Sequence, residues 1–152
     1  YVAILFGRSR GTEDIDLFIK PVPKDIFVLL YSDLKKQGYW CLNAESEEEV
    51  FSYLQYGIAV RFANRGETIP NFEIKMARKF LDLHVFTDYI DVETDQGILR
   101  ISSLERQIAF KRYYLGSEKD WEDALHVEEM FKGLLDTEKI KKYKELINQE
   151  HG

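Results

Sequence analysis

The stretch Gly7-Arg8-Ser9-Arg10-Gly11-Thr12-Glu13-Asp14-Ile15-Asp16-Leu17-Phe18-Ile19 decides the expected fold. Its second half is a short apolar run that contains two carboxylates, and we expect a β-strand over residues 14–19. Alternate side chains of a strand point to the same face, so Asp14 and Asp16 share one face. Two like charges held side by side repel each other unless a cation lies between them. Hard oxygen ligands suit Mg²⁺, so the strand predicts a magnesium site.

The first half of this stretch is a loop with two glycines, two arginines, a serine and a threonine. Such a loop offers backbone N–H groups and guanidinium groups to an anion. Phosphate-binding donors beside metal-binding acids indicate a nucleoside triphosphate held by Mg²⁺. The alternative is that an isolated Asp-x-Asp pair marks a strand end or a solvated face.

Length and composition set the class of protein. The chain has 152 residues, 45% hydrophobic and 32% charged, which predicts one soluble globular unit with a sizeable core. The formal net charge of −6 does not favour broad attraction to nucleic acid, although a local basic cleft is compatible with it. Cys41 is the single cysteine, so no internal disulfide forms, and we expect a reducing cytoplasmic compartment. No stretch has the length and apolarity of a membrane span.

The pattern along the chain predicts an α+β fold. Strands are expected over 14–19, 58–63 and 71–77, the last two forming a hairpin, with helices over 24–37 and 46–56. A second hairpin is expected over 89–93 and 98–102. Tyr1–Phe6 is either a buried strand or a helix, because periodicity does not decide on so short a run. After Ser102 the pattern becomes helical, over 106–115, from about Ser117 to Lys132, and from Thr137 to about Asn148.

A third carboxylate commonly helps two-metal phosphoryl-transfer chemistry. Glu73 lies in the expected strand Phe72-Glu73-Ile74-Lys75, where polar and apolar residues alternate. The alternative is an ordinary solvent face of an edge hairpin. Asp82 and Asp91 are further candidates for the third acid.

A second charged segment follows the expected helix over 106–115. Lys111 lies near the end of that helix, and Asp120 and Asp123 are one turn apart on the next helix. A lysine can hold a triphosphate as a point charge, and the acids would orient it or bind a base or ribose. The alternative is a helix N-terminus that carries acids because of its dipole, with a lysine that reaches the solvent.

Taken together, these segments resemble the nucleotidyltransferase superfamily of DNA polymerase β type. They are most similar to AbiEii-like nucleotidyltransferases, the toxin group of type IV toxin–antitoxin systems. Gly7–Asp16 resembles the family's Arg-x-Thr-x-Asp-h-Asp segment, in which h is apolar. Leu104–Lys111 resembles the family's helix that ends in a lysine, and Gly116–Asp123 resembles the Arg/Lys-Asp-x-x-Asp segment that follows it. The similarity spans Tyr1 to about Lys132.

The resemblance implies a nucleotidyltransferase-like mixed β-sheet flanked by helices, with a C-terminal helical bundle. It implies a core over 1–102 and a helical segment over 103–152 that packs on it. Because the chain starts at Tyr1 rather than at methionine, we expect a segment upstream that contains the first strand of the core.

The resemblance also implies a site and a reaction. Asp14 and Asp16 would hold Mg²⁺, with Mn²⁺ as an alternative, and Glu73 would complete the metal site or act as a base. The remaining residues implied in nucleotide binding are Arg10, Thr12, Lys111, Asp120 and Asp123. The reaction would move an NMP from an NTP to an RNA end or a protein hydroxyl, in a toxin with a cognate antitoxin.

One alternative of a different class remains. The phosphate-binding glycine pair that precedes the Asp-x-Asp strand in this family is absent from these residues. In this alternative, the chain is a catalytically inactive interaction module that keeps the nucleotidyltransferase fold.

Overall fold

The computed structural model describes residues 1–9 and 11–151, and only the backbone of His151. The chain divides into two compact units. Unit 1 contains Tyr1 and Gly11–Leu83, and unit 2 contains the described residues of Val2–Arg10 and His84–Gly152. This division differs from the expected boundary after Ser102, because the second hairpin and the N-terminal helix group with the C-terminal helices.

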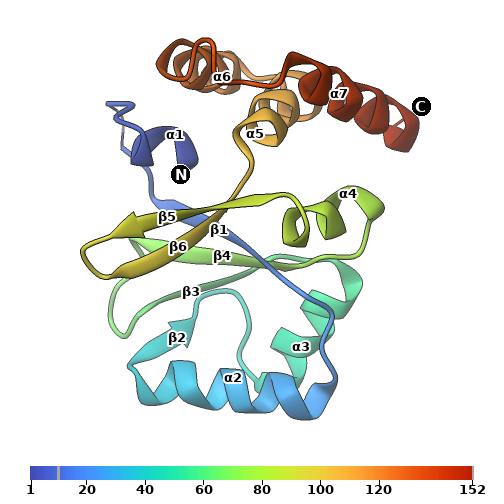
Figure 1. Ribbon diagram of the computed structural model, residues 1–152. Helices are drawn as coiled ribbons and strands as arrows, with labels where there is room; N and C mark the ends of the chain where they lie inside the picture. The colour runs from blue at the N-terminus through green and yellow to red at the C-terminus, as the bar shows by residue number, and fades with distance from the viewer. Residues whose placement is uncertain (10, 152) are drawn as a thin grey trace. The chain divides into compact units, whose positions relative to one another are not determined.

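Unit 1 is built on a four-stranded mixed sheet with the strand order β1-β4-β3-β2 (Figure 1). β1 pairs parallel with β4, while β3 pairs antiparallel with both β4 and β2. The elements of unit 1 are β1 (Asp14–Ile19), α2 (Lys24–Lys36), β2 (Tyr39–Cys41), α3 (Glu47–Tyr56), β3 (Val60–Asn64), β4 (Asn71–Met76) and the short α4 (Phe80–Leu83).

The ends of the unit 1 helices follow from local sequence. Ser46 accepts a hydrogen bond from the Glu49 N–H at 3.2 Å and so caps α3. The Glu49 carboxylate in turn accepts a hydrogen bond from the Glu45 N–H at 2.8 Å. α2 ends before Gly38, whose φ of +89° is left-handed, a conformation that glycine adopts without steric cost.

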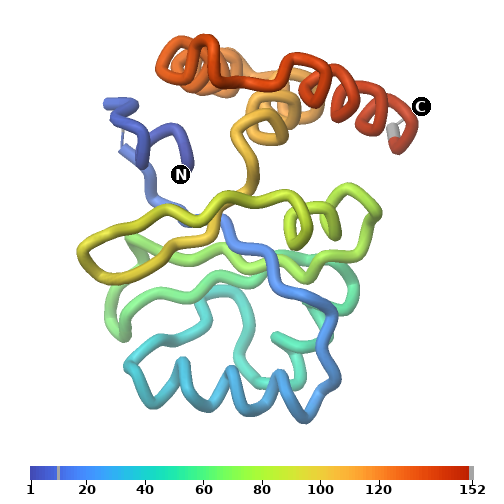
Figure 2. Tube along the Cα trace, viewed as in Figure 1, coloured from blue at the N-terminus to red at the C-terminus, as the bar shows by residue number. Residues whose placement is uncertain are grey.

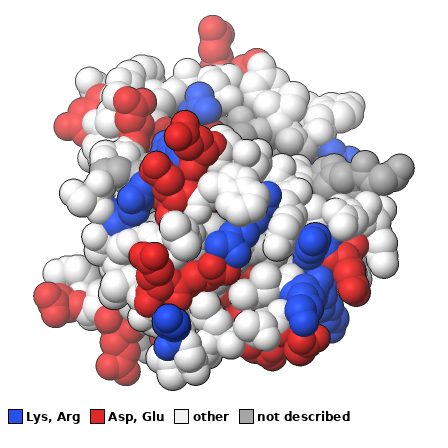
Figure 3. Space-filling model, turned by 90° about the horizontal axis from the view of Figure 1, so that it is seen from above, with Lys and Arg blue, Asp and Glu red and all other residues white. Residues whose placement is uncertain are grey.

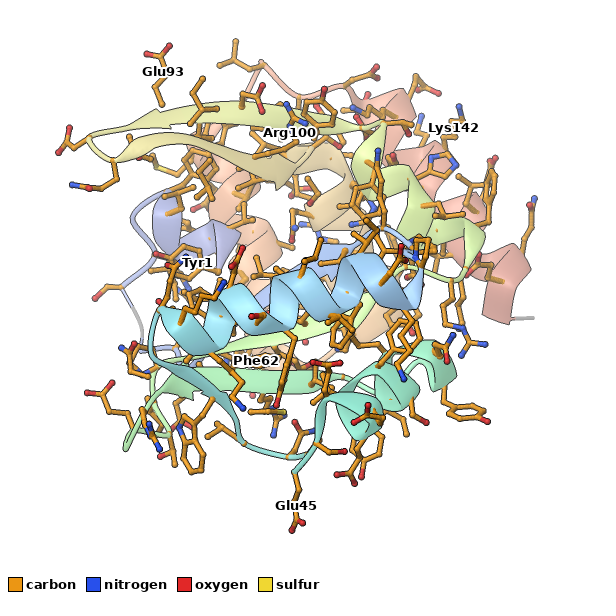
Figure 4. The ribbon with its side chains drawn as sticks, turned by 90° about the horizontal axis from the view of Figure 1, so that it is seen from below. Tyr1, Glu45, Phe62, Glu93, Arg100 and Lys142 are labelled. Carbon is orange, nitrogen blue, oxygen red and sulfur yellow. The ribbon has the colours of Figure 1, made fainter. Side chains whose placement is uncertain are left out.

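One face of this sheet packs against α2 and α3 and forms the core of unit 1. In Figure 4 the labelled Phe62 side chain extends from β3 toward α2, where its ring meets Tyr31 edge-on with centroids 6.1 Å apart. Glu45, in the loop before α3, projects away from this core. The buried residues of the core are Phe27, Tyr31, Val50, Phe51, Leu54, Val60, Phe62, Ile74 and Met76. Because strand side chains alternate, the residues between the buried ones on β3 and β4 point to the opposite face.

Unit 2 combines a two-stranded hairpin with helices. Its elements are α1 (Val2–Leu5), the 3-10 turn η1 (His84–Phe86), β5 (Tyr89–Thr94), β6 (Gly97–Ser102), α5 (Leu104–Phe110), the π-helical turn η2 (Lys111–Leu115), α6 (Glu118–Met130) and α7 (Thr137–His151). The expected hairpin is confirmed, with Thr94 paired with Gly97 at its tip. The helix expected over 106–115 begins at Leu104 and widens into a π-helix at Lys111, and it ends at Gly116, whose φ is +69°.

The N-terminal segment belongs to the core of unit 2. α1, blue in the trace of Figure 2, packs on the orange-red α6 from the C-terminal half of the chain. Ala3 is buried there against Leu104, Ile108, Ala124 and Val127. Of the two alternatives for Tyr1–Phe6, the structure shows the helix.

A part-buried carboxylate, Asp88, connects α7 to the rest of unit 2. Asp88 accepts hydrogen bonds from the Ser103 hydroxyl, the Lys139 ammonium at 2.6 Å and the Tyr143 hydroxyl. Burial and the neighbouring Asp88 raise the pKa of Tyr143, so its hydroxyl remains a donor at neutral pH.

Within the described residues the fold is mixed α+β, with seven α-helices, the four-stranded sheet and the two-stranded sheet. β2 lies in a segment for which the sequence pattern predicted no element. A search of the same residues finds no helix with the length and apolarity needed to cross a membrane.

Candidate functional site

The two carboxylates of the Asp-x-Asp pair lie on β1, an edge strand of the sheet of unit 1. β1 is in parallel register with β4, so that Asp14 is opposite Asn71 and Asp16 is opposite Glu73. Directly opposite residues of neighbouring strands point to the same face. The next strand continues the row, because Arg61 of β3 is opposite Glu73. We call Asp14, Asp16, Arg61, Asn71, Glu73 and Lys75 the polar face of unit 1.

Asn71 fixes the first of these carboxylates. Its Nδ2 donates to Asp14 Oδ1 at 2.7 Å and to the backbone oxygen of Thr68 at 3.3 Å. The Asn71 residue is 6% exposed, and its Oδ1 is buried without a hydrogen-bond partner among the described residues. An oxygen acceptor with unused lone pairs therefore lies beside Asp14.

Glu73 is held by two cations. Its Oε2 accepts from Arg61 Nη2 at 2.8 Å and Arg61 Nε at 3.1 Å, and its Oε1 lies 2.7 Å from Lys75 Nζ. Burial alone would raise the pKa of Glu73, but the hydrogen bonds from Lys75 and Arg61 outweigh it and lower the pKa. The carboxylate is therefore ionised at neutral pH. The same hydrogen bond with Glu73, followed by the charges of Asp14 and Asp16, raises the pKa of Arg61.

The carboxylate oxygens of β1 are of the type that binds Mg²⁺ together with a phosphorylated substrate. Mg²⁺ is commonly bound through one or two carboxylates together with substrate phosphates and water, rather than by a complete protein cage. Asp14 and Asp16 supply carboxylate ligands of that kind, whereas Asn71 Oδ1 is closed off from solvent. Among the described residues there is no group of three or more acidic, histidine or cysteine side chains positioned to hold a metal.

The loop before β1 was predicted to bind phosphate through Arg10 and Thr12. The Thr12 hydroxyl donates to the backbone oxygen of Asp14 at 2.9 Å, which closes a tight turn into the strand. Arg10 lies outside the described residues, and its predicted role stays a prediction.

The second predicted group is assembled in unit 2. Lys111 Nζ lies 2.9 Å from Asp120 Oδ1 and 3.0 Å from Asp123 Oδ2. The Lys111 side chain is 13% exposed and the Asp123 side chain is fully buried. Of the arrangements that the sequence left open, the structure shows the one in which the two acids on α6 contact the lysine on η2.

Two features complete this cluster. Arg8, from the segment after α1, approaches Asp123 Oδ1 with its Nε at 3.4 Å and pairs with Glu122 at the surface. Burial would raise the pKa of Asp120, but hydrogen bonds from Ser117 and Lys111 lower it. We call Arg8, Lys111, Asp120 and Asp123 the buried cluster of unit 2. Its lysine leaves the helix within a π-helical turn, a geometry that is frequent at functional sites.

Neither further candidate for the third acid joins the polar face. Asp82 accepts hydrogen bonds from the backbone N–H groups of Arg78 and Lys79, at 3.2 and 3.1 Å, in the turn that leads into α4. Asp91 forms a salt bridge with Arg100 at 2.9 Å on the hairpin of unit 2. In Figure 4 Arg100 and Glu93 are labelled on this hairpin. Of the three acids, Glu73 alone is opposite Asp16.

Four residues of these groups were not predicted as site residues from the sequence, namely Asn71, Lys75, Arg61 and Arg8. Asn71 and Lys75 lie two residues either side of Glu73, so strand alternation was a signal for both. Arg61 follows from its register with Glu73 only once the hairpin is paired. For Arg8 there was no such signal, because its partner Asp123 is 115 residues away.

On the face of the molecule shown in Figure 3, acidic and basic residues are interspersed and neither sign covers it continuously. Comparison of the chain with models of known protein families gives no match. A comparison with curated proteins gives none either.

Proposed function

We propose that this chain is a Mg²⁺-dependent nucleotidyltransferase that moves an NMP from an NTP to an acceptor hydroxyl. The observation that carries the proposal is the polar face of unit 1. Asp14 and Asp16 lie on one strand, Glu73 is directly opposite Asp16, and two cations lie beside them. The proposal also rests on the resemblance of residues 7–16 to the Asp-x-Asp segment of the nucleotidyltransferase superfamily.

In this proposal Asp14 and Asp16 bind the metal that accompanies the nucleotide, and Asn71 holds Asp14 in place. When bound, Mg²⁺ neutralises charge on the phosphates. The acceptor oxygen forms a bond to the α-phosphorus, the bond from that phosphorus to the bridging oxygen breaks, and pyrophosphate leaves. Glu73 completes the metal site or accepts the proton of the attacking hydroxyl. Thr12 shapes the turn before Asp14 through its hydrogen bond to the backbone.

The buried cluster of unit 2 agrees with the resemblance in its composition. Asp120 and Asp123 orient Lys111 through two salt bridges. Contact of Lys111 and Arg10 with phosphate groups is part of the proposal, as are an RNA end or a protein hydroxyl as acceptor and a cognate antitoxin as partner.

The first test is isothermal titration of the full chain with ATP, CTP, GTP and UTP in the presence of Mg²⁺ and then of Mn²⁺. We expect binding of at least one NTP, and a loss of affinity of at least tenfold in Asp14→Asn and Asp16→Asn. Asp25→Asn, an exposed acid in the first turn of α2, is the control and should bind like the wild type. Equal affinity in the wild type and both strand variants would overturn the proposal.

The second test concerns the biological role. Expression of an active toxin should arrest growth, and Asp16→Ala should abolish the arrest without lowering the amount of folded protein. Labelled NTP incubated with total RNA and with total protein then shows which class of acceptor gains the NMP. Arrest that persists with Asp16→Ala would contradict a toxin that acts through this face.

One observation favours the second candidate, a catalytically inactive module with this fold. Both oxygens of Glu73 are engaged by cations, so the third acid does not face an open metal position. Transfer of labelled NMP from an NTP to total RNA or total protein decides between the two candidates, because the inactive module transfers none even where it binds an NTP.

A further inference from the structure

The arrangement around Glu73 carries an inference about the ligand of the polar face. Two cations share this one carboxylate, and the Glu73 side chain is 12% exposed while Arg61 and Lys75 are 50% and 43% exposed. The acid is therefore enclosed, and both cations have one side open to solvent. No other carboxylate of the described residues lies within salt-bridge distance of Arg61 or Lys75.

The positive and negative charges of the polar face are not matched one to one. Arg61 and Lys75 contribute two positive charges against the single negative charge of Glu73. Asp14 and Asp16 contribute two negative charges on the neighbouring strand, and neither is paired with a cation among the described residues. The face therefore has a cationic side on β3 and β4 and an anionic side on β1, with neighbouring strands about 4.8 Å apart.

Carboxylates and phosphates accept hydrogen bonds from an arginine in the same geometry. The guanidinium group presents parallel N–H donors that match two oxygens of either anion, and a lysine adds a mobile point charge. Glu73 thus occupies the position that a phosphate group would take between Arg61 and Lys75. A polyphosphate can contact these cations at one end and carry a metal to Asp14 and Asp16 at the other.

We propose that Arg61 and Lys75 are the phosphate-binding groups of this face for a di- or triphosphate anion, and that Glu73 occupies them until that anion arrives. The inference rests on the proposed function in one respect, namely that the natural polyphosphate is an NTP. Binding of the anion releases the Glu73 carboxylate directly opposite Asp16, where the third acid of the proposed reaction is required. Glu73 is then both the internal competitor of the substrate and a group that becomes available when the substrate binds.

The test uses the full chain and inorganic pyrophosphate and tripolyphosphate, titrated without any divalent cation. Glu73→Gln keeps the shape of the side chain and removes its charge, so we expect at least tenfold tighter binding. Arg61→Met and Lys75→Met each remove one cation and should weaken binding at least tenfold. Unchanged affinity in both cation variants, or weaker binding in Glu73→Gln, would overturn the inference.

Matched controls come from the hairpin of unit 2. Arg100 makes two hydrogen bonds to the Asp91 carboxylate, at 2.9 and 3.3 Å, as Arg61 does to Glu73. Asp91→Asn and Arg100→Met should leave the affinity for both anions within twofold of the wild type. A change as large as that in the Glu73 and Arg61 variants would show a general charge effect and overturn the inference. If circular dichroism shows that Glu73→Gln does not fold, the two cation variants decide the question by the same tenfold criterion.

The inference and the proposed function fail in different experiments. If polyphosphate binding depends on Arg61 and Lys75 while no NTP binds with Mg²⁺ or Mn²⁺, the proposed function fails and the phosphate site stands. If NTP binding depends on Asp14 and Asp16 but not on Arg61 or Lys75, the phosphate site fails and the proposed function stands.

Discussion

The polar face of unit 1 and the buried cluster of unit 2 contain the same chemical groups, yet they differ in how far these groups are buried. In the buried cluster Asp123 is fully buried and Lys111 is 13% exposed. In the polar face the cations Arg61 and Lys75 are about half exposed and Asp16 is exposed. The difference in burial indicates that the enclosed pairs stabilise the fold, whereas the half-exposed cations of the polar face are open to a second anion, as proposed above.

The largest expected effect comes from breaking the enclosed pair. Lys111→Met should lower the free energy of unfolding by about 3–5 kcal/mol, because it leaves the fully buried Asp123 without its lysine. Urea denaturation followed by circular dichroism measures this change. The control is Lys141→Met, whose exposed pair with Glu138 should contribute nothing measurable. Equal stability of the wild type and Lys111→Met would show that this enclosed pair does not stabilise the fold.

A smaller effect is expected at Asp88, the part-buried carboxylate of unit 2. Tyr143→Phe removes one of three donors to Asp88 and should cost about 1.5–3 kcal/mol, the usual worth of a hydrogen bond to a charged group. Tyr56→Phe, at a side chain that is 76% exposed, is the control. Thermal and urea unfolding of both variants check the difference, and a Tyr143→Phe protein as stable as the control would count against the role of Asp88.

Carboxyls of both units are expected to contribute to the pH dependence of stability. Hydrogen bonds from their partners lower the pKa values of Asp88, Asp120 and Glu73 in the folded chain, against the opposing effect of burial. Carboxyls of this kind contribute stability that is complete above their unfolded pKa and is lost as the pH falls through their folded pKa. With ordinary values of 3.8 for Asp and 4.5 for Glu, we expect the urea midpoint to fall as the pH drops below about 4.5.

The comparison for this pH experiment is Asp88→Asn, which removes one of the three titrating groups. Its midpoint should be lower at pH 7 and should depend less steeply on pH between 4.5 and 3. A midpoint of the wild type that rises on acidification would contradict the direction of these pKa shifts.

The smallest stability effect is expected on the polar face. Asp16→Asn removes one of two like charges on β1 and should change the free energy of unfolding by only about 0.2–1 kcal/mol, toward higher stability in the absence of divalent cations. Adding Mg²⁺ with an NTP should raise the melting temperature of the wild type and leave that of Asp16→Asn unchanged. A large loss of stability in Asp16→Asn would show that this acid has a structural role like that of Asp123.

Much of the local structure could be predicted from the sequence, because its causes lie within a few residues. The alternation over Asp14–Ile19 gave β1 with the bounds that the structure has. The cap at Ser46 and the left-handed glycines Gly38 and Gly116 gave helix ends near their observed positions. The proximity of Lys111 to Asp120 and Asp123 was also predictable, since the two helices that carry them are joined by a short turn.

The composition of the two charged groups was decided only by the tertiary structure. The parallel pairing of β1 with β4 brings Asn71 to Asp14 across 57 residues, and no local pattern specifies which strand pairs with which. The pairing of β3 with β4 places Arg61 on Glu73, and the packing of α1 on α6 brings Arg8 to Asp123 across 115 residues. The sequence by itself thus determined most of the elements, β2 excepted, and the acids on them. Which cation each acid meets depends on packing between distant segments, because burial and register, not neighbouring residues, bring those charges together.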